Sequence, residues 1–239
     1  MISKVKNDLF DYKNRYIMQM KDGFKFSLDS LLLAEFVNIK KDDKKILDMC
    51  TGNAPVPLVL SLKSDAEIIG FEIQKEISEL ALESVAINGL EKNIRIINDD
   101  IKNIDNYFES NTFDIITCNP PYFNTLDNGY KNKNDYLTIA RHEVMINLED
   151  IFKIAYNYLK NNGVFYLVHR SNRLDDIMYY AKQYRLNVKM LQFISTKSDG
   201  ELNTILVKCV KNSKSGVRVL KPICVGNLDT YQHLFEGKC

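Results

Sequence analysis

Apolar positions repeat along this chain in two ways, and the change from one to the other marks the predicted elements. Short apolar runs, typical of buried strands, alternate with longer segments in which apolar residues recur every third or fourth position, as in amphipathic helices. The predicted strands are 45–49, 67–72, 94–98, 113–118, 163–168, 188–195 and 202–210. The predicted helices are 56–63, 75–88, 148–160 and 172–184. This alternation predicts an α/β fold with helices on both faces of a mostly parallel sheet.

The last two predicted strands are joined by a short connection. Only residues 196–201 separate them, which is too few for a crossover between parallel strands. We therefore expect a seven-stranded, mostly parallel sheet with an antiparallel last strand. In open α/β sheets, ligands bind in the crevice at the carboxyl ends of the strands, so functional residues are expected there.

The two ends of the chain are predicted to be extensions of one main domain. Residues 45–211 form that domain, preceded by an extension over 1–44 and followed by one over 212–239. In the first extension, Asp22-Gly23 between short alternating runs predicts a hairpin over 15–26. Ser27 is then expected to cap a helix that continues through Val37. The second extension is expected to add an edge strand at 217–220.

Composition excludes few partners. The formal net charge is +1, so a nucleic acid would have to be bound by a local basic patch. The sequence has neither an apolar run that could span a membrane nor a signal peptide, and we expect a cytoplasmic protein, with a monomer favoured. The five cysteines lack CxxC spacing, which predicts reduced thiols and no metal site; they are Cys50, Cys118, Cys209, Cys224 and Cys239.

The clearest chemical signal is the turn Asn119-Pro120-Pro121-Tyr122, which follows an apolar strand. Two prolines make this backbone rigid. The side-chain oxygen of Asn119 and the carbonyl of Pro120 could then accept hydrogen bonds from one amino group, while Tyr122 offers a flat face to a planar ring. An ordinary strand-ending turn is the alternative interpretation.

Polar groups also follow the first three predicted strands. Gly52 lies in a small-residue turn, Glu72 ends the second strand, and Asp100 follows the third. An acidic residue at the position of Glu72 is typical of ribose binding, and the three strand ends together predict a site for an adenosine-bearing cofactor. Singly, Gly52 could end a strand, Glu72 could lie on the surface, and Asp100 could cap a helix. NAD is disfavoured because its G-x-G-x-x-G fingerprint is missing.

With this acid and the Asn-Pro-Pro-Tyr turn, residues 26–210 resemble the class-I S-adenosylmethionine-dependent methyltransferases that modify exocyclic or amide nitrogens. More narrowly, the chain is similar to the bacterial family that methylates N6 of adenine 37 in a valine tRNA. That similarity rests on residues 26–34, Thr51-Gly52-Asn53 with Pro57-Leu58, and Ala140-Arg141-His142-Glu143. It implies a Rossmann-like fold, S-adenosyl-L-methionine as cofactor and tRNA as partner.

The resemblance also assigns site residues. It implies cofactor contacts from Phe26, Asp29, Asp48, Gly52, Asn53, Glu72, Ile73, Asp100, Ile101 and Asn119. Asn119, Pro120 and Tyr122 are the expected catalytic groups, and no metal is expected. Substrate RNA is expected to contact Tyr122, Lys131, Lys133, Arg141, His142, Arg170 and Arg173. Ala54 departs from the wider class, which carries a glycine there, and its methyl group is expected to crowd the cofactor or force a different turn.

Two alternative functions stay open. An amide nitrogen could use the same turn, which would make the chain a protein glutamine N5-methyltransferase. About 44 residues precede the first strand, which leaves little room for a protein-substrate domain. A noncatalytic RNA-binding protein that has kept the fold is the third possibility.

Overall fold

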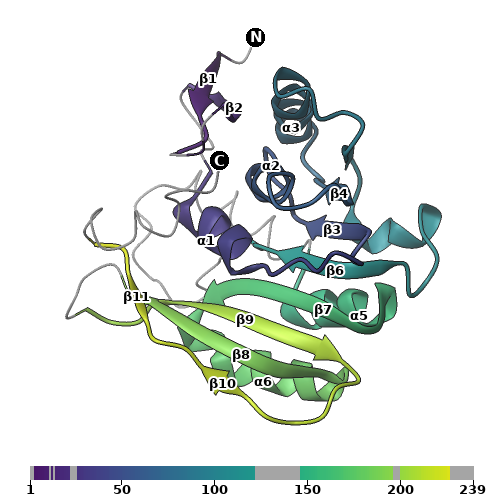
Figure 1. Ribbon diagram of the computed structural model, residues 1–239, viewed down its shortest axis with the longest axis vertical. Coiled ribbons are helices and arrows are strands. Elements are labelled where there is room, and N and C mark those ends of the chain that lie inside the picture. Colours follow the sequence, from purple (N-terminus) through teal and green to yellow (C-terminus); the bar gives the residue numbers. More distant parts are fainter. Residues whose placement is uncertain are drawn as a thin grey trace, which may run out of the picture.

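The computed structural model describes residues 3–10, 12, 14–21, 26–121, 146–195 and 200–226. Its centre is a mostly parallel sheet (Figure 1) with the strand order β10-β8-β9-β7-β6-β3-β4-β5, and β11 pairs with β8. All seven predicted strands are present: β3 Lys45–Met49, β4 Glu67–Phe71, β5 Ile94–Ile97, β6 Phe113–Cys118, β7 Leu159–Arg170, β8 Leu186–Ser195 and β9 Thr204–Lys211. The antiparallel strand is confirmed, because β9 runs antiparallel to both β7 and β8.

In the described part of the chain, the sheet has nine strands rather than seven. The predicted edge strand exists as β10 (Arg218–Val219), and a second short strand, β11 (Ile223–Cys224), also pairs with β8. Both are two-residue strands in a segment with little apolar periodicity. Such short edge strands depend on the neighbour that they pair with, which explains why the sequence pattern did not predict β11.

Helices cover both faces of the sheet (Figure 1). They are α1 (Leu28–Phe36), α2 (Pro55–Leu60), α3 (Lys75–Ile87), α5 (Leu148–Tyr158) and α6 (Leu174–Gln183), with 3₁₀ turns η1 (Ile101–Asn106) and η2 (Ser171–Arg173). Neighbouring strand residues point to opposite faces, and so Ile46 and Ile115 pack in the core under α1 and α2, while Leu47 and Ile116 pack in the core under α5 and α6. The strands are therefore buried on both faces, which is the reason for their continuous apolar runs.

The N-terminal extension contains a hairpin that the sequence did not predict. Strand β2 (Tyr16–Met20) pairs antiparallel with β1 (Lys4–Asp8), a polar segment upstream. The predicted turn at Asp22-Gly23 lies outside the described residues. The hairpin is fixed on α3, where the Asn88 side chain hydrogen bonds to both the backbone N–H and the carbonyl of Tyr16. These contacts join segments far apart in sequence, and turn chemistry alone does not predict them.

Within the described ranges, no helix has the length and apolar character needed to cross a membrane.

Candidate active site

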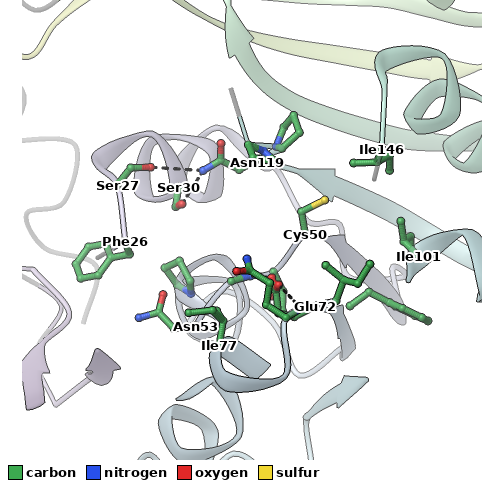
Figure 2. A pocket seen from close by; sticks show the side chains of 18 of the residues that line it. Phe26, Ser27, Ser30, Cys50, Asn53, Glu72, Ile77, Ile101, Asn119 and Ile146 are labelled. Carbon is green, nitrogen blue, oxygen red and sulfur yellow. Dashed lines mark hydrogen bonds between the residues drawn. The ribbon is translucent and has the colours of Figure 1, made fainter. Parts of the chain in front are cut away.

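A cavity of about 540 Å³ opens at the carboxyl ends of β3, β4 and β6. Figure 2 shows Phe26 at one end of it and Ile101 and Ile146 at the other. Its lining includes every predicted cofactor-binding residue except Asp48: Phe26, Asp29, Gly52, Asn53, Glu72, Ile73, Asp100, Ile101 and Asn119. The parallel strands bring these residues to one edge of the sheet, although they are separated by up to 93 positions (119 − 26) in the sequence.

Glu72 is the buried acid of this cavity. Its carboxylate accepts hydrogen bonds from the backbone N–H groups of Gly52 and Gln74, both at 2.9 Å. Burial raises the pKa of Glu72, and these hydrogen bonds oppose that shift. A carboxylate has about four acceptor positions, so the remaining ones suit a pair of donor hydroxyl groups. The surface alternative for Glu72 is thereby wrong, since only 6% of the residue is exposed.

Asp48 lies behind the cavity wall instead of lining it. Thr51 and Thr117 donate hydroxyl hydrogen bonds to its two carboxylate oxygens at 2.7 and 2.5 Å. Burial raises the pKa of Asp48 to about 7, and the nearby charge of Glu72 also raises it. Asp48 therefore holds the Thr51 loop in place from behind, and any direct contact with a cofactor stays a prediction.

Asp100 caps a helical turn and also lines the cavity, and its contact with a cofactor stays a prediction. Its side chain accepts a hydrogen bond from the Lys102 N–H at 3.0 Å and so caps η1, while the same residue lines the cavity. The adjacent Asp99 also lines the cavity and accepts hydrogen bonds from Tyr107 and Asn103 at 2.8 and 2.9 Å. Asp99 was not predicted as a site residue, although it stands beside Asp100 in the sequence.

The loop after β3 places two residues in the left-handed backbone region on either side of Asn53. Gly52 has φ 59° and Ala54 has φ 73°. For a residue with a side chain, this conformation costs about 1–2 kcal/mol, which explains the preference for glycine. The methyl group of Ala54 is fully buried, and Ala54 is not among the described residues that line the cavity. This position does not favour crowding of the cofactor by Ala54, and any effect on the cofactor stays a prediction.

We expect Gly52→Ala to weaken cofactor binding about tenfold or more, because it introduces left-handed strain into a residue that lines the cavity. Ala54→Gly should leave the affinity within about twofold. Calorimetry with S-adenosylmethionine measures both. Equal losses of affinity in the two variants would contradict the conclusion that Gly52 lines the cavity and Ala54 does not.

Asn119 follows β6 at the edge of the cavity, held by helix α1 (Figure 2). Its amide nitrogen donates a hydrogen bond to the Ser30 hydroxyl at 2.8 Å, and the Ser27 hydroxyl lies at 3.5 Å. The amide oxygen points away from both serines (Figure 2). Ser27 occupies the N-cap position of α1 but makes no side-chain cap, contrary to the prediction. The sequence did not single out Ser30, whose one signal is that it is a polar residue buried among leucines.

The predicted RNA-binding residues are only partly described. Arg170, at the end of β7, lines the cavity, whereas Arg173 pairs with Asp176 at 2.6 Å and is not among the lining residues. Residues Tyr122, Lys131, Lys133, Arg141 and His142 lie outside the described ranges. His169 is buried, and desolvation together with the nearby arginines lowers its pKa to about 4, so the ring is neutral near pH 7. It accepts the Arg170 N–H at 2.9 Å, which is a structural role.

The donor and acceptor groups of the cavity fit an adenosyl cofactor. Phe71, Ile73 and Ile101 supply apolar surface for a purine, and Glu72 supplies acceptors for ribose hydroxyl groups. Asn53 donates to the Met18 carbonyl at 2.8 Å, while its buried side-chain oxygen has no partner among the described residues. The described residues include no cluster of histidine, cysteine and acidic side chains suited to a metal ion.

Residues 40–220 match the family model described as a methyltransferase domain. The chain is 26% identical over 215 residues to a Bacteroides thetaiotaomicron protein named tRNA1(Val) (adenine(37)-N6)-methyltransferase, covering 89% of this chain and 87% of that one. It is 24% identical to a protein of the same name from Aliivibrio salmonicida, with 84% of each chain covered.

Solved structures share this fold. A crystal structure described as a predicted O-methyltransferase from Agrobacterium tumefaciens superposes with a TM-score of 0.65 at 18% identity, covering 82% of this chain and 87% of that one. M. jannaschii TYW2 in complex with AdoMet gives a TM-score of 0.58 at 13% identity, with 88% and 86% covered. The fold is therefore the Rossmann-like class-I methyltransferase fold, as predicted.

Proposed function

Because this chain belongs to the methyltransferase-domain family matched over residues 40–220, we propose that it methylates the exocyclic N6 of an adenine in tRNA. Adenine 37 of a valine tRNA is the expected target. S-adenosylmethionine is the cofactor, and methyl transfer is the reaction class. The observation that carries the finer proposal is the Asn119 amide, oriented by Ser30 and followed by Pro120 at the edge of the cofactor cavity. The names of the relatives from B. thetaiotaomicron and A. salmonicida support tRNA as substrate.

Asn119 and Pro120 are proposed to activate the adenine N6 amine as a nucleophile. An exocyclic adenine amine is a poor nucleophile because its lone pair is delocalised into the ring. Hydrogen bonds from this amine to the Asn119 side-chain oxygen and the Pro120 carbonyl favour a pyramidal nitrogen and stabilise its growing positive charge. When bound, S-adenosylmethionine supplies an electrophilic methyl group. The residues thus act by orientation and electrostatics and need no strong base.

Tyr122 is the proposed stacking surface for the target base. Stacking on an aromatic side chain stabilises by about 1–3 kcal/mol, which is similar to the few kcal/mol needed to extrude a base. An unpaired loop adenine is consequently an easier target than a paired one. Lys131, Lys133, Arg141, His142, Arg170 and Arg173 stay the predicted RNA contacts, and a cytoplasmic monomer without a metal stays our expectation.

The test is transfer of labelled methyl groups to unmodified valine tRNA, followed by nucleoside analysis. N6-methyladenosine at position 37 is the expected product. Label in a protein glutamine, with none in tRNA, would instead favour the glutamine alternative. Salt-dependent tRNA binding without transfer, and without heat on titration with S-adenosylmethionine, would favour the noncatalytic alternative.

We expect Ser30→Ala to lower kcat about tenfold with a smaller effect on KM for tRNA, because the Asn119 amide loses the hydrogen bond that orients it. Ser30→Thr keeps the hydroxyl and should recover most of the rate. Ser27→Ala is the matched control, since Ser27 lies at 3.5 Å from the same nitrogen and should matter less. Equal effects of the Ser30 and Ser27 alanine variants would contradict the positioning role of Ser30.

A further inference from the structure

A second cavity, of about 570 Å³, lies next to the first one. It is formed where β7 ends, along β8, and by the segment that leads into β9. Its lining residues are Arg170, Ser171, Asn172, Phe193, Glu201, Leu202 and Asn203. Arg170 lines both cavities, so the two sites share a wall.

This second cavity is close to the catalytic turn because of the strand register. Strands β6 and β7 are parallel neighbours, and Cys118 pairs with Leu167. Asn119 comes directly after Cys118, and Arg170 comes three residues after Leu167. A ligand whose reacting group meets Asn119 can therefore continue past Arg170 into the second cavity.

Hydrogen bonds join the two segments that form the walls. The Ser171 N–H donates to the Asn203 carbonyl at 3.0 Å, and the Ser171 hydroxyl donates to the Leu202 carbonyl. Arg170 also donates to the Thr204 hydroxyl at 3.4 Å. The walls are consequently held in place by the protein itself, so that a ligand does not have to order them.

The side chains in this cavity have the chemistry of a base-binding site. Phe193 is half-buried and supplies an aromatic ring, while Asn172, Asn203 and Glu201 supply amide and carboxylate groups for the edge of a base. Glu201 adds a negative charge to the lining that also contains Arg170. A site for phosphate alone would be expected to lack a carboxylate, which repels phosphate. The presence of both Glu201 and Arg170 therefore favours a base in the cavity, with the sugar-phosphate backbone near Arg170.

We propose that the second cavity binds the base of the nucleotide adjacent to the target adenosine in the RNA strand. This inference rests on the proposed function. The target base meets Asn119 in the first cavity, the strand passes Arg170, and the neighbouring base stacks on Phe193. Contacts with this unstacked neighbouring base would make the enzyme selective for a particular RNA sequence or loop conformation. The catalytic turn alone does not supply that selectivity.

The first part of the test is kinetic. Phe193→Ala and Asn203→Ala should raise KM for valine tRNA, about five- to hundredfold for Phe193, while kcat at saturating tRNA and the affinity for S-adenosylmethionine stay within about twofold. Phe193→Trp keeps a flat ring and should restore KM, which separates stacking from a packing defect. Tyr179→Ala is the matched control, because Tyr179 is an aromatic residue with 65% exposure that is not among the described lining residues of either cavity.

The second part identifies the occupant. Ligated tRNAs with an abasic site directly 5′ or 3′ of the target adenosine are compared with intact tRNA. For the wild type, one of the two should raise KM, and Phe193→Ala should be insensitive to the same change. Wild-type activity that is unaffected by both abasic sites would overturn the inference while leaving the proposed function in place. No wild-type transfer to tRNA at all would overturn both.

Discussion

Replacing Asn119 with alanine is expected to lower kcat for methyl transfer about 100- to 1000-fold. The loss is comparable to that of removing one preorganised group that stabilises transition-state charge. The hydrogen bond from the amine to the amide oxygen strengthens as positive charge grows on the nitrogen, so kcat should fall far more than KM for tRNA rises. Single-turnover transfer of labelled methyl groups to tRNA measures the effect directly.

Cofactor binding separates a catalytic role of Asn119 from a merely structural one. Asn119 also lines the cofactor cavity, so calorimetry with S-adenosylmethionine should accompany the kinetics. Asn106→Ala is the matched control, because Asn106 is an exposed amide at the end of η1. Transfer that persists in the Asn119 variant, or a loss explained wholly by weaker cofactor binding, would refute the catalytic role.

Replacing Asp48 with asparagine is expected to stabilise the fold at alkaline pH. The pKa of Asp48 is raised from 3.8 to about 7 by its burial. Between these values the folded chain holds a proton that the unfolded chain releases, so the free energy of unfolding falls as pH rises, by about 1.4 kcal/mol per pH unit. Asparagine has no such proton. Its stability advantage over wild type should therefore grow by about 3 kcal/mol from pH 5 to pH 8.

Urea denaturation of the cofactor-free proteins at several pH values provides this measurement. Asparagine can keep one hydrogen bond to each of Thr51 and Thr117, accepting one through its amide oxygen and donating the other from its amide nitrogen, so the loss of the buried charge is the main change. Asp42→Asn, at an exposed carboxylate, is the control. A pH-independent difference between Asp48→Asn and wild type would show that Asp48 is ionised in the folded protein throughout this range.

Sequence pattern was most informative where structure is local. Strands β3 and β6 were predicted with their observed bounds, because strands covered on both faces are rich in apolar residues. The short connection between β8 and β9 predicted their antiparallel pairing for a geometric reason that needs no tertiary information. The site residues at strand ends followed from the same logic, since parallel strands bring their carboxyl ends to one edge.

Pairings between distant segments were not accessible in this way. The partner of β2 is the polar strand β1, and β2 packs on α3, which lies more than 50 residues later. Periodicity places Ser30 on a helix but gives no measure of its distance from Asn119, which is 89 residues away in the sequence and 2.8 Å away in space. Ser30 is a candidate for positioning Asn119 only because folding places α1 beside the end of β6.

The sequence by itself determined the alternation of strands and helices, the chemistry of the Asn119 turn and the acidic groups Glu72 and Asp100. Only the tertiary structure decided which of these groups face the cavity. Asp48 and Thr117 come from neighbouring strands paired in register, and their hydrogen bond holds the Asp48 carboxylate behind the cavity wall. The physical reason is that burial and hydrogen bonding depend on neighbours brought together by folding, whereas periodicity and turn chemistry are properties of a single stretch of chain.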